Sequence, residues 1–308
     1  MNRTTRSLCL AVGALAFGAP TAMACVNVGV YQDQPAKTLP ALQKVAGKNV
    51  KTVSTYLTVG HALDPKLVTL AKKNGVKLLI SWLPDAGQDS AKAPGYRLSA
   101  IAAGKFDADL KALGKQIKAL PHGAIVRPMP DANTPWYAWS GTVNGNRPGD
   151  YAKAWKHVRK VLIKAAGAKK VRLLWSVYAR SVPDAKNNAL SVYFPGAKQV
   201  DLVGADAYNF GNAQGLTWTA PADLFLPAYG TIQKLAAKKP FWISETGSTA
   251  RGGDEGAWIG ALGQLGKTMP KLAGVVWYDV RDSTGDFRVP RKGAAGAAFK
   301  AFVKNACK

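Results

Sequence analysis

Two segments of the sequence end in a carboxylate that could act as an acid, a base or a nucleophile. The run Val126–Trp139, VRPMPDANTPWYAW, carries Asp131, and the run Phe241–Ser248, FWISETGS, carries Glu245. In each segment the carboxylate follows an apolar stretch, as it would at the end of a buried strand. Two carboxyl groups that face each other across a Trp-lined cleft can hydrolyse a glycosidic bond. The remaining sequence must therefore supply a scaffold that brings the two segments together.

The same pattern of an apolar run, turn residues and a helical stretch recurs along the chain. The runs are rich in Val, Ile, Leu, Trp and Tyr, and several are continuously apolar, which favours strands buried on both faces. The expected strands are Cys25–Tyr31, Val50–Val59, Val76–Leu83, Ala124–Met129, Val171–Tyr178, Val200–Ala207, Phe241–Ser244 and Gly274–Val280.

Helical patterns separate most of these runs. Asp64 and Pro65 begin the clearest helix and Gly75 follows its end, whereas Asp150 is the expected cap of another. The expected helices are Pro65–Asn74, Phe106–Leu120, Tyr151–Ala166, Leu224–Ala237, Glu255–Lys267 and Gly293–Ala306. Repeated strand–helix units over this length predict an α/β fold, a single (β/α)8 TIM barrel. A doubly wound open sheet is the alternative, but no Gly-x-Gly-x-x-Gly follows a strand.

Polar and aromatic residues gather where the expected strands end, which is the catalytic face of such barrels. They are Asp33, Trp82, Asp85, Arg127, Asp131, Trp175, Asp206, Tyr208, Glu245, Trp277 and Asp279. Carboxylates suit acid–base chemistry on sugars, and flat aromatic rings suit their apolar C–H faces. Structural roles remain open for most of them: Asp131 as a turn residue, Arg127 as an ion-pair partner, and Trp136 and Trp139 as packing for a long loop. Glu245 is the hardest to explain structurally, because burying an unpaired charge at the end of an apolar run is costly.

The first 24 residues have the features of a signal peptide. Arg3 and Arg6 precede an apolar stretch too short to span a membrane, and Ala22-Met23-Ala24 is a small-x-small cleavage site. No later stretch is long enough for a transmembrane helix. We therefore expect an exported protein, periplasmic or extracellular, with a barrel domain over residues 25–308.

Two cysteines remain after this segment, Cys25 and Cys307. An even number of cysteines in an exported protein favours a disulfide. The barrel would place both at its bottom face, where strand one starts and the last helix ends. Lipid anchoring at Cys25 is the alternative, but Ala22 stands where lipoprotein signals usually carry a bulky aliphatic residue.

The chain is strongly basic, with 42 Lys and Arg against 18 Asp and Glu and a formal charge of +24. The Lys residues lie mostly on expected helices, and no basic run has the spacing of a nucleic-acid motif. A diffuse solvated surface accounts for the charge without a nucleic-acid partner, and an acidic polysaccharide or cell surface remains open.

These segments resemble glycoside hydrolase family 26, the β-mannanases and their relatives. The family's strand-four motif is matched by Arg127, Pro128, Asn133, Trp136 and Trp139; its strand-seven Ser-Glu by Ser244 and Glu245; and its strand-six motif by Asp206, Tyr208 and Asn209. The resemblance implies that Glu245 is the nucleophile, held by Tyr208, and that the strand-four position supplies the acid. It further implies sugar contacts by Arg127, Asn133 and Asp206, with Trp82, Trp136, Trp139 and Trp277 lining subsites.

The chain departs from the family at the acid. Pro130 replaces the family's His, and Asp131 replaces its catalytic Glu. One methylene less withdraws the carboxylate by about 1.5 Å, and a misplacement of about 1 Å can reduce a rate roughly 100-fold. The shorter acid is compatible with a shifted loop in a retaining enzyme, with an inverting geometry, or with a disabled site.

We therefore expect an exported, monomeric, endo-acting glycosidase that cleaves a β-linked mannan, glucan or exopolysaccharide. A polysaccharide-binding protein that has lost the acid is the second hypothesis, and an adhesive or structural cell-surface protein is the third. The histidines His61, His122 and His157 show no ligand spacing, so neither a metal nor an organic cofactor is expected.

Overall fold

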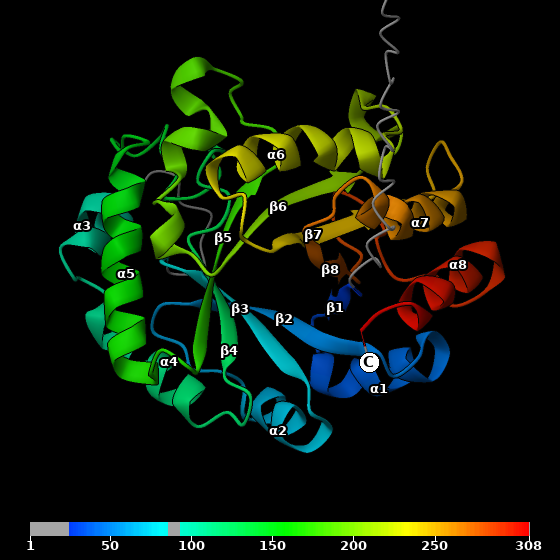
Figure 1. The fold of residues 1–308 in the computed structure, drawn as a ribbon, viewed down its shortest axis with the longest axis horizontal. Coiled ribbons are helices and arrows are strands. Elements are labelled where there is room, and N and C mark those ends of the chain that lie inside the picture. The colour runs from blue at the N-terminus through cyan, green and yellow to red at the C-terminus, as the bar shows by residue number, and fades with distance from the viewer. Residues whose placement is uncertain (1–24, 86–92, 308) are drawn as a thin grey trace, which may run out of the picture.

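The strands form a closed parallel barrel in which each strand pairs with the next and β8 pairs with β1. The computed structural model describes residues 25–85 and 93–307 (Figure 1). The strands are β1 Asn27–Tyr31, β2 Val50–Thr58, β3 Lys77–Leu83, β4 Ala124–Pro128, β5 Val171–Tyr178, β6 Leu202–Asn209, β7 Phe241–Ser248 and β8 Leu272–Tyr278. The expected (β/α)8 barrel is confirmed.

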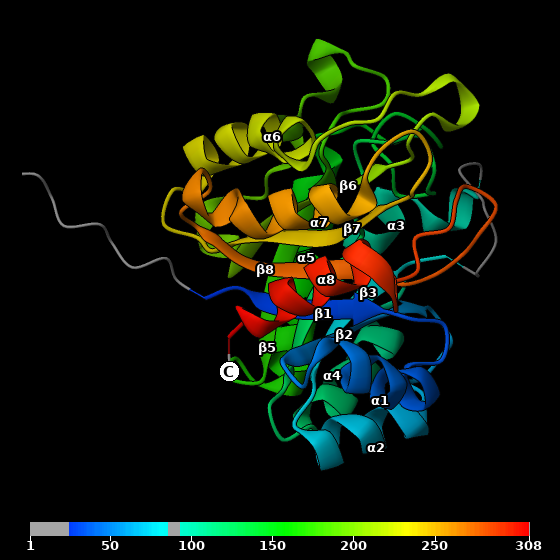
Figure 2. The same cartoon turned by 90° about the vertical axis from the view of Figure 1, so that its right-hand side faces the viewer.

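Helices surround the barrel (Figures 1 and 2). They are α1 Pro35–Ala46, α2 Pro65–Asn74, α3 Leu98–Ala102, α4 Asp107–Lys118, α5 Asp150–Ala166, α6 Pro221–Leu235, α7 Glu255–Gln264 and α8 Gly293–Lys304. The sequence pattern missed α1 and α3. Pro40 lies inside α1 and weakens its helical signal, and α3 is only five residues long.

One of the two expected helix caps is confirmed. Asp64 Oδ1 accepts a hydrogen bond of 2.8 Å from the Lys66 amide at the start of α2. The cap expected at Asp150 is wrong, because Asp150 is the first residue of α5 and its carboxylate pairs with Lys153 at 3.5 Å instead.

Two apolar layers hold the barrel together. The larger layer lies between strands and helices, and a smaller cluster fills the inside of the barrel: Leu79, Ile125, Leu174, Leu202, Trp242 and Val276. Trp242 packs so closely on Gly274 that a Cβ added there would lie 2.4 Å from its ring. Because the interior is filled, a substrate can reach the barrel only at a face, and the polar residues mark the face where the strands end.

The two ends of the described chain are joined. Cys25 and Cys307 form a disulfide with their Cα atoms 4.9 Å apart, and the Cys307 amide donates to the Val26 carbonyl at 3.0 Å. Figure 2 shows the C-terminus beside the start of β1. The expected disulfide is therefore present, and a Cys25 sulfur held in it is not available to a lipid. The expected signal peptide, residues 1–24, lies outside the described residues.

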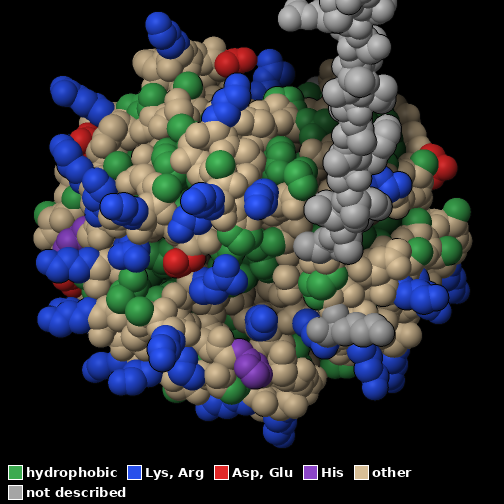
Figure 3. All heavy atoms as spheres, viewed as in Figure 1, with side chains coloured by type: hydrophobic (Ala, Val, Ile, Leu, Met, Phe, Trp, Pro, Cys, Tyr) green, Lys and Arg blue, Asp and Glu red, His purple; other side chains and the backbone are tan. Residues whose placement is uncertain are grey.

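The basic residues are spread over the surface. In the view of Figure 3, Lys and Arg side chains are scattered widely, with few Asp and Glu among them. Within residues 25–85 and 93–307, no helix is long and apolar enough to cross a membrane.

Candidate functional site

A buried arginine joins the carboxylates at the carboxyl ends of β6 and β7. Arg127, near the end of β4, is 1% exposed. Its Nη1 pairs with Asp206 Oδ2, and its Nη2 lies 3.3 Å from Glu245 Oε2. Its Nε donates to Ser81 Oγ at 2.8 Å. Burial lowers the pKa of the guanidinium, but the charges of Asp206 and Glu245 outweigh burial and raise that pKa well above its usual range. Arg127 therefore stays charged and compensates the two buried carboxylates.

Glu245 reaches the barrel interior through a β-bulge. In the pairing of β6 with β7, Ala205 is opposite Ile243 but Asp206 is opposite Glu245, so Ser244 is the extra residue. A bulge re-aims the side chains that follow it. As a result Ser244 and Glu245, although adjacent, both contact residues inside the barrel.

Two tyrosine hydroxyls hold the Glu245 carboxylate. Tyr56, near the end of β2, donates to Oε2 at 2.5 Å, and Tyr208 donates to Oε1. Burial and the Glu245 charge both raise the pKa values of these hydroxyls well above their ordinary value, so both remain protonated donors. Glu245 is thus fixed by two hydroxyls and one guanidinium, in a position that is 5% exposed.

Asp206 lies beside Glu245 on the neighbouring strand β6 and is 2% exposed. Its Oδ1 accepts from Ser244 Oγ and, at 3.4 Å, from Ser176 Oγ. Burial, opposed by the charge of Arg127, raises the pKa of Asp206 to about 6. Asp206 therefore holds the Arg127 guanidinium and the Ser244 hydroxyl in place.

Asp131 occupies a strained turn after β4. Its φ is 54°, and Met129 two residues earlier has φ 50°; both values are unusual for residues other than Gly. Thr134 bonds the Asp131 backbone carbonyl through its amide at 3.0 Å and its hydroxyl at 2.8 Å. The buried Oδ1 of Asp131 has no hydrogen-bond partner among the described residues. The carboxyl group therefore does not close a turn, which is the structural role that the sequence left open.

The environment of Asp131 favours its protonated form. Burial, and after it the charge of Asp206, raises the pKa of Asp131 well above its ordinary value, although Arg127 acts in the opposite direction. A carboxyl group that keeps its proton near neutral pH is suited to donate that proton to a leaving group.

An open cavity of about 280 Å³ lies at the barrel mouth with Glu245 in its wall. Aromatic residues form most of the wall, and Asp282 and Thr284 complete it. The lining residues are Tyr56, Trp136, Tyr178, Tyr208, Phe210, Glu245, Tyr278, Asp282, Thr284 and Phe287. Asp131, 8% exposed, is not among them.

Three of the expected subsite residues prove to be core residues. Trp82, Trp139 and Trp277 are between 0 and 1% exposed. The Trp277 indole donates to the Phe287 carbonyl at 2.7 Å and packs on Phe299 of α8. The Trp139 indole donates to the Pro130 carbonyl at 2.8 Å. In this structure the three side chains are buried in the apolar core, and none of them lines the cavity.

Three of the polar residues that were expected to contact sugar are buried and bonded to protein groups. Asn133 is fully buried; its Nδ2 donates to the Tyr178 carbonyl at 2.8 Å, and its Oδ1 accepts from the Tyr178 amide at 2.9 Å. Arg127 and Asp206 lie beneath the cavity wall. These side chains orient neighbouring groups. Trp136 differs from them: its side chain is 42% exposed and packs edge-on against Tyr178 in the wall.

Several wall residues were missed by the sequence reading: Tyr56, Tyr178, Phe210, Tyr278 and Phe287. All five are aromatic, and three of them, Tyr56, Tyr178 and Tyr278, lie at or near strand ends. Tyr278 follows Trp277, and because side chains alternate along a strand, one faces the cavity when the other faces the helices. An aromatic residue at a strand end, next to one that faces the helices, was therefore the sequence signal that could have identified such wall residues.

No cluster of three or more His, Cys, Asp or Glu side chains is placed to hold a metal ion in the part of the chain that the structure describes.

A closed (β/α)8 barrel with a fixed carboxylate at the end of β7, facing an aromatic cavity, has the arrangement of a barrel glycoside hydrolase. The comparisons with known proteins point the same way. The sequence profile of glycosyl hydrolase family 26 matches residues 87–222. This match supports a relationship to that family.

Two curated proteins are similar in sequence. Endoglucanase H of Acetivibrio thermocellus is 29% identical over 277 residues, which cover 87% of this chain and 29% of that protein. Mannan endo-1,4-beta-mannosidase of Bacillus subtilis strain 168 is 30% identical over 198 residues, which cover 62% of this chain and 47% of that protein. The chain therefore matches less than half the length of either relative.

Solved structures share the fold at low sequence identity. GH26C from Muricauda sp. superposes with a TM-score of 0.68 at 16% identity, over 92% of this chain and 86% of that one. The modular endo-beta-1,4-mannanase of Cellulomonas fimi gives 0.66 at 15% identity, over 90% and 70%. At such identities the likeness establishes the barrel fold alone.

Proposed function

We propose that the chain belongs to glycoside hydrolase family 26 and is an exported endo-acting hydrolase of a β-linked polysaccharide. The observation that carries this proposal is Glu245. It lies in the wall of the cavity at the barrel mouth, and Tyr56, Tyr208 and Arg127 hold it in place. Burying a carboxylate costs free energy, which these donors offset, and together they hold the charge in one position where it can act on a substrate.

In the proposed mechanism Glu245 is the nucleophile and the enzyme retains configuration. The Glu245 carboxylate attacks the anomeric carbon, and the bond to the leaving oxygen breaks as Asp131 gives that oxygen its proton. Water then attacks the anomeric carbon of the glycosyl–enzyme intermediate while ionised Asp131 takes a proton from that water. The bond between the sugar and Glu245 breaks, and the Glu245 carboxylate is regenerated. The raised pKa of Asp131 supports its acid role.

The wall of the cavity supports a sugar substrate. Trp136 and Tyr178 meet edge-on at 5.0 Å, and Tyr278 stacks on Tyr31, so flat rings border the space beside Glu245. Such rings pack against the C–H faces of pyranoses. The relatives are named for mannan and glucan hydrolysis, and we propose a β-mannan, a β-glucan or a related exopolysaccharide as substrate. A monomer is sufficient for this site.

Export is supported by the chain termini. The disulfide between Cys25 and Cys307 is consistent with an oxidising compartment, where such bonds form and persist. The signal-peptide features of residues 1–24 agree with that compartment.

A second function is favoured by one observation. The Asp131 carboxyl is absent from the cavity wall and is one methylene shorter than the family's acid. A barrel in which this group cannot reach the leaving oxygen would bind polysaccharide without cleaving it.

One experiment separates the two functions. The purified protein is incubated with β-mannans, β-glucans and exopolysaccharides, and new reducing ends are measured for the wild type and for Glu245→Gln. Hydrolysis that falls at least about 1000-fold in the variant, with oligosaccharide binding retained, supports the enzyme. Binding without reducing ends, restored to hydrolysis by Asp131→Glu, supports the binding protein. Full activity in Glu245→Gln would remove this residue from the mechanism.

A further inference from the structure

A second, larger cleft adjoins the Glu245 cavity. It encloses about 610 Å³ between the β7–α7 loop and the β8–α8 loop, both on the face where the strands end. Asp282 and Thr284 line both this cleft and the Glu245 cavity. The two spaces are therefore neighbours, and a polymer bound beside Glu245 could extend into the larger cleft.

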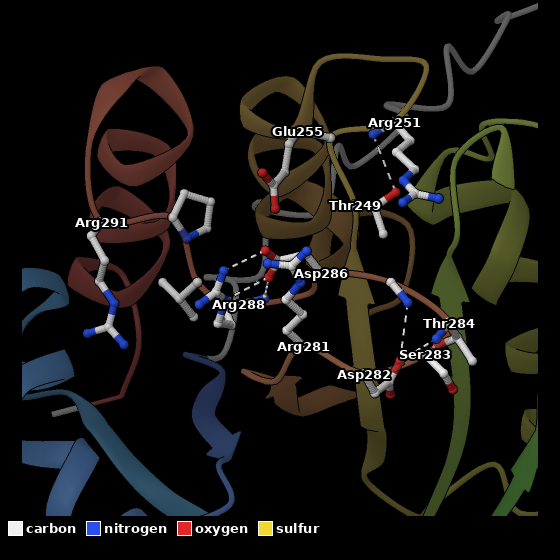
Figure 4. A pocket seen from close by; sticks show the side chains of 14 residues that line it. Thr249, Arg251, Glu255, Arg281, Asp282, Ser283, Thr284, Asp286, Arg288 and Arg291 are labelled. Atoms are coloured by element: carbon white, nitrogen blue, oxygen red, sulfur yellow. Dashed lines mark hydrogen bonds and ion pairs between the residues drawn. The ribbon is translucent and has the colours of Figure 1, made fainter.

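Arginines dominate the charge of this cleft. Four line it: Arg251, Arg281, Arg288 and Arg291. Figure 4 shows Arg281 and Arg288 grouped around Asp286, Arg251 on one side near Thr249, and Arg291 on the opposite side. Among the residues that the structure describes, no lysine lines the cleft, although lysines outnumber arginines over the chain as a whole. Planar guanidiniums bind oxyanions through paired hydrogen bonds, which lysine cannot do.

Two of the four arginines are already paired. Arg288 forms a two-point contact with Asp286, with Nε to Oδ1 at 2.8 Å and Nη2 to Oδ2 at 2.6 Å. Arg291 Nη2 lies 3.4 Å from Asp279 Oδ2. The side chains of Arg251 and Arg281 are exposed, and neither guanidinium has a hydrogen bond or ion pair to any residue that the structure describes.

The carboxylates in the cleft offset only part of this charge. Asp286 is neutralised by Arg288. Although burial acts the other way, hydrogen bonds from Thr284 and Gly285 lower the pKa of Asp282, which therefore stays ionised and supplies one negative charge. Burial and the charge of Asp286 raise the pKa of Glu255 to about 7, which removes part of its negative charge near neutral pH. The cleft therefore has an excess of positive charge and two guanidiniums without a partner.

We propose that this cleft binds an anionic substituent, a sugar carboxylate or a sulfate ester, so that the substrate is an acidic β-glycan whose charged residue lies beside the sugar held at Glu245. The proposal rests on the proposed function, because it uses the Glu245 cavity as the neighbouring subsite. Arg251 and Arg281 supply the contacts to the anion. The aromatic cavity holds the adjoining ring, as it would for a neutral chain.

The test compares oligosaccharides that differ only in charge. Hexamers of β-1,4-linked mannose and of β-1,4-linked mannuronate share a backbone but carry a hydroxymethyl or a carboxylate at C5; a sulfated mannohexaose supplies the third arm. Dissociation constants are measured by calorimetry on Glu245→Gln, which holds the ligand uncleaved, in low salt and in about 0.5 M salt. The same ligands are offered to the wild-type protein for hydrolysis.

The matched variants remove equal charge from opposite ends of the barrel. Arg251→Gln with Arg281→Gln empties the cleft of its unpaired guanidiniums. Lys77→Gln with Arg172→Gln removes two exposed charges near the starts of β3 and β5. All four substituted side chains are exposed, and thermal melts confirm folding before binding is measured.

We expect one charged hexamer to bind at least about tenfold more tightly than the neutral one in low salt, from charge-assisted contacts to two arginines. The advantage should disappear in the cleft variant and persist in the Lys77/Arg172 control. Whether mannuronate or the sulfated hexamer holds the advantage identifies the anion. Equal binding of neutral and charged hexamers, with neutral hexamers cleaved, would overturn the proposal and leave the proposed function standing. If no hexamer is bound but a neutral β-glucan is cleaved, the proposal fails and the proposed function stands; if no hexamer and no β-glucan or exopolysaccharide is bound or cleaved, both fail.

Discussion

The hydrogen bond from Tyr208 to Glu245 gives the clearest quantitative test of the site. Replacing Tyr208 by Phe removes one buried hydroxyl donor from Oε1 of a carboxylate that is 5% exposed. A hydrogen bond to a charged group contributes about 1.5–3 kcal/mol. Gln keeps an acceptor oxygen but loses the charge. A double-mutant cycle that combines Tyr208→Phe with Glu245→Gln should therefore give the difference between a charged and a neutral hydrogen bond, about 1 kcal/mol.

The assay is equilibrium denaturation in urea of the wild type, the two single variants and the double variant, at pH 7. The cycle isolates the pair because changes in the unfolded chain cancel between its parallel sides. Tyr178 provides the control, since it lines the same cavity but its hydroxyl does not bond Glu245. Tyr178→Phe should couple to Glu245→Gln by less than about 0.5 kcal/mol.

A Tyr208–Glu245 coupling as small as the Tyr178 control would refute the reasoning. It would mean that Glu245 is not held by the β6 hydroxyl, and the case for a fixed nucleophile would lose its main support. This outcome does not depend on finding a substrate, so the site can be tested before the reaction is known.

Two further predictions concern the acid and the floor of the barrel. The pKa of Asp131 is raised in the folded protein, so from about pH 4 upward the unfolded chain releases a proton that the folded chain retains. The free energy of unfolding of the wild type, measured relative to Asp131→Asn, should therefore fall as the pH rises above this value. A difference that stays flat or rises with pH would contradict a buried, protonated carboxyl group. Gly274→Ala would place its Cβ 2.4 Å from the Trp242 ring and should destabilise the folded protein by about 1–3 kcal/mol in urea denaturation. The control, Gly260→Ala in α7, has no atom within 4 Å of the added Cβ and should stabilise the folded protein by about 0.4–1 kcal/mol. Equal effects of the two substitutions would show that the barrel floor is not tightly packed.

The scaffold could be predicted because each of its units carries a local signal. Buried parallel strands read as short continuous apolar runs, and helices such as α2 begin at a capping Asp and Pro and end before a Gly. Expected and observed strands differ mainly in their ends, as in β6, expected to begin at Val200 and observed from Leu202 to Asn209. The expected carboxylate Glu245 lies where the barrel rule places catalytic groups.

The direction of side chains could not be predicted from apolarity alone. In this barrel both faces of a strand are covered, one by the interior and one by helices, so both carry large apolar residues. Trp277 and Trp242 are equally apolar, yet Trp277 packs on α8 and Trp242 lies inside the barrel. Small residues mark the interior, such as Gly274 beneath Trp242. Only the paired positions of all strands distinguish the two faces.

The loop that carries Asp131 could not be predicted for a different reason. Its course depends on two residues with positive φ, Met129 and Asp131, neither of which is Gly. Such backbone conformations are held by the surrounding contacts, here the bonds of Thr134 to the Asp131 carbonyl and of Trp139 to the Pro130 carbonyl. The sequence places Asp131 at the acid's position but contains no local signal for how far its carboxyl reaches.

The decisive feature of the site is an irregularity in β7. In a regular strand Ser244 and Glu245 would face opposite sides of the barrel wall, and Glu245 would point toward the helices as Trp277 does. The bulge turns both inward, so that Ser244 bonds Asp206 while Glu245 meets Tyr208 and Arg127. Because the Arg127 guanidinium contacts both carboxylates, the bulge, the arginine and the proposed nucleophile depend on one another. Deleting Ser244 would therefore not merely shorten the strand: it would turn Glu245 out of the cavity and leave Arg127 buried with one carboxylate instead of two.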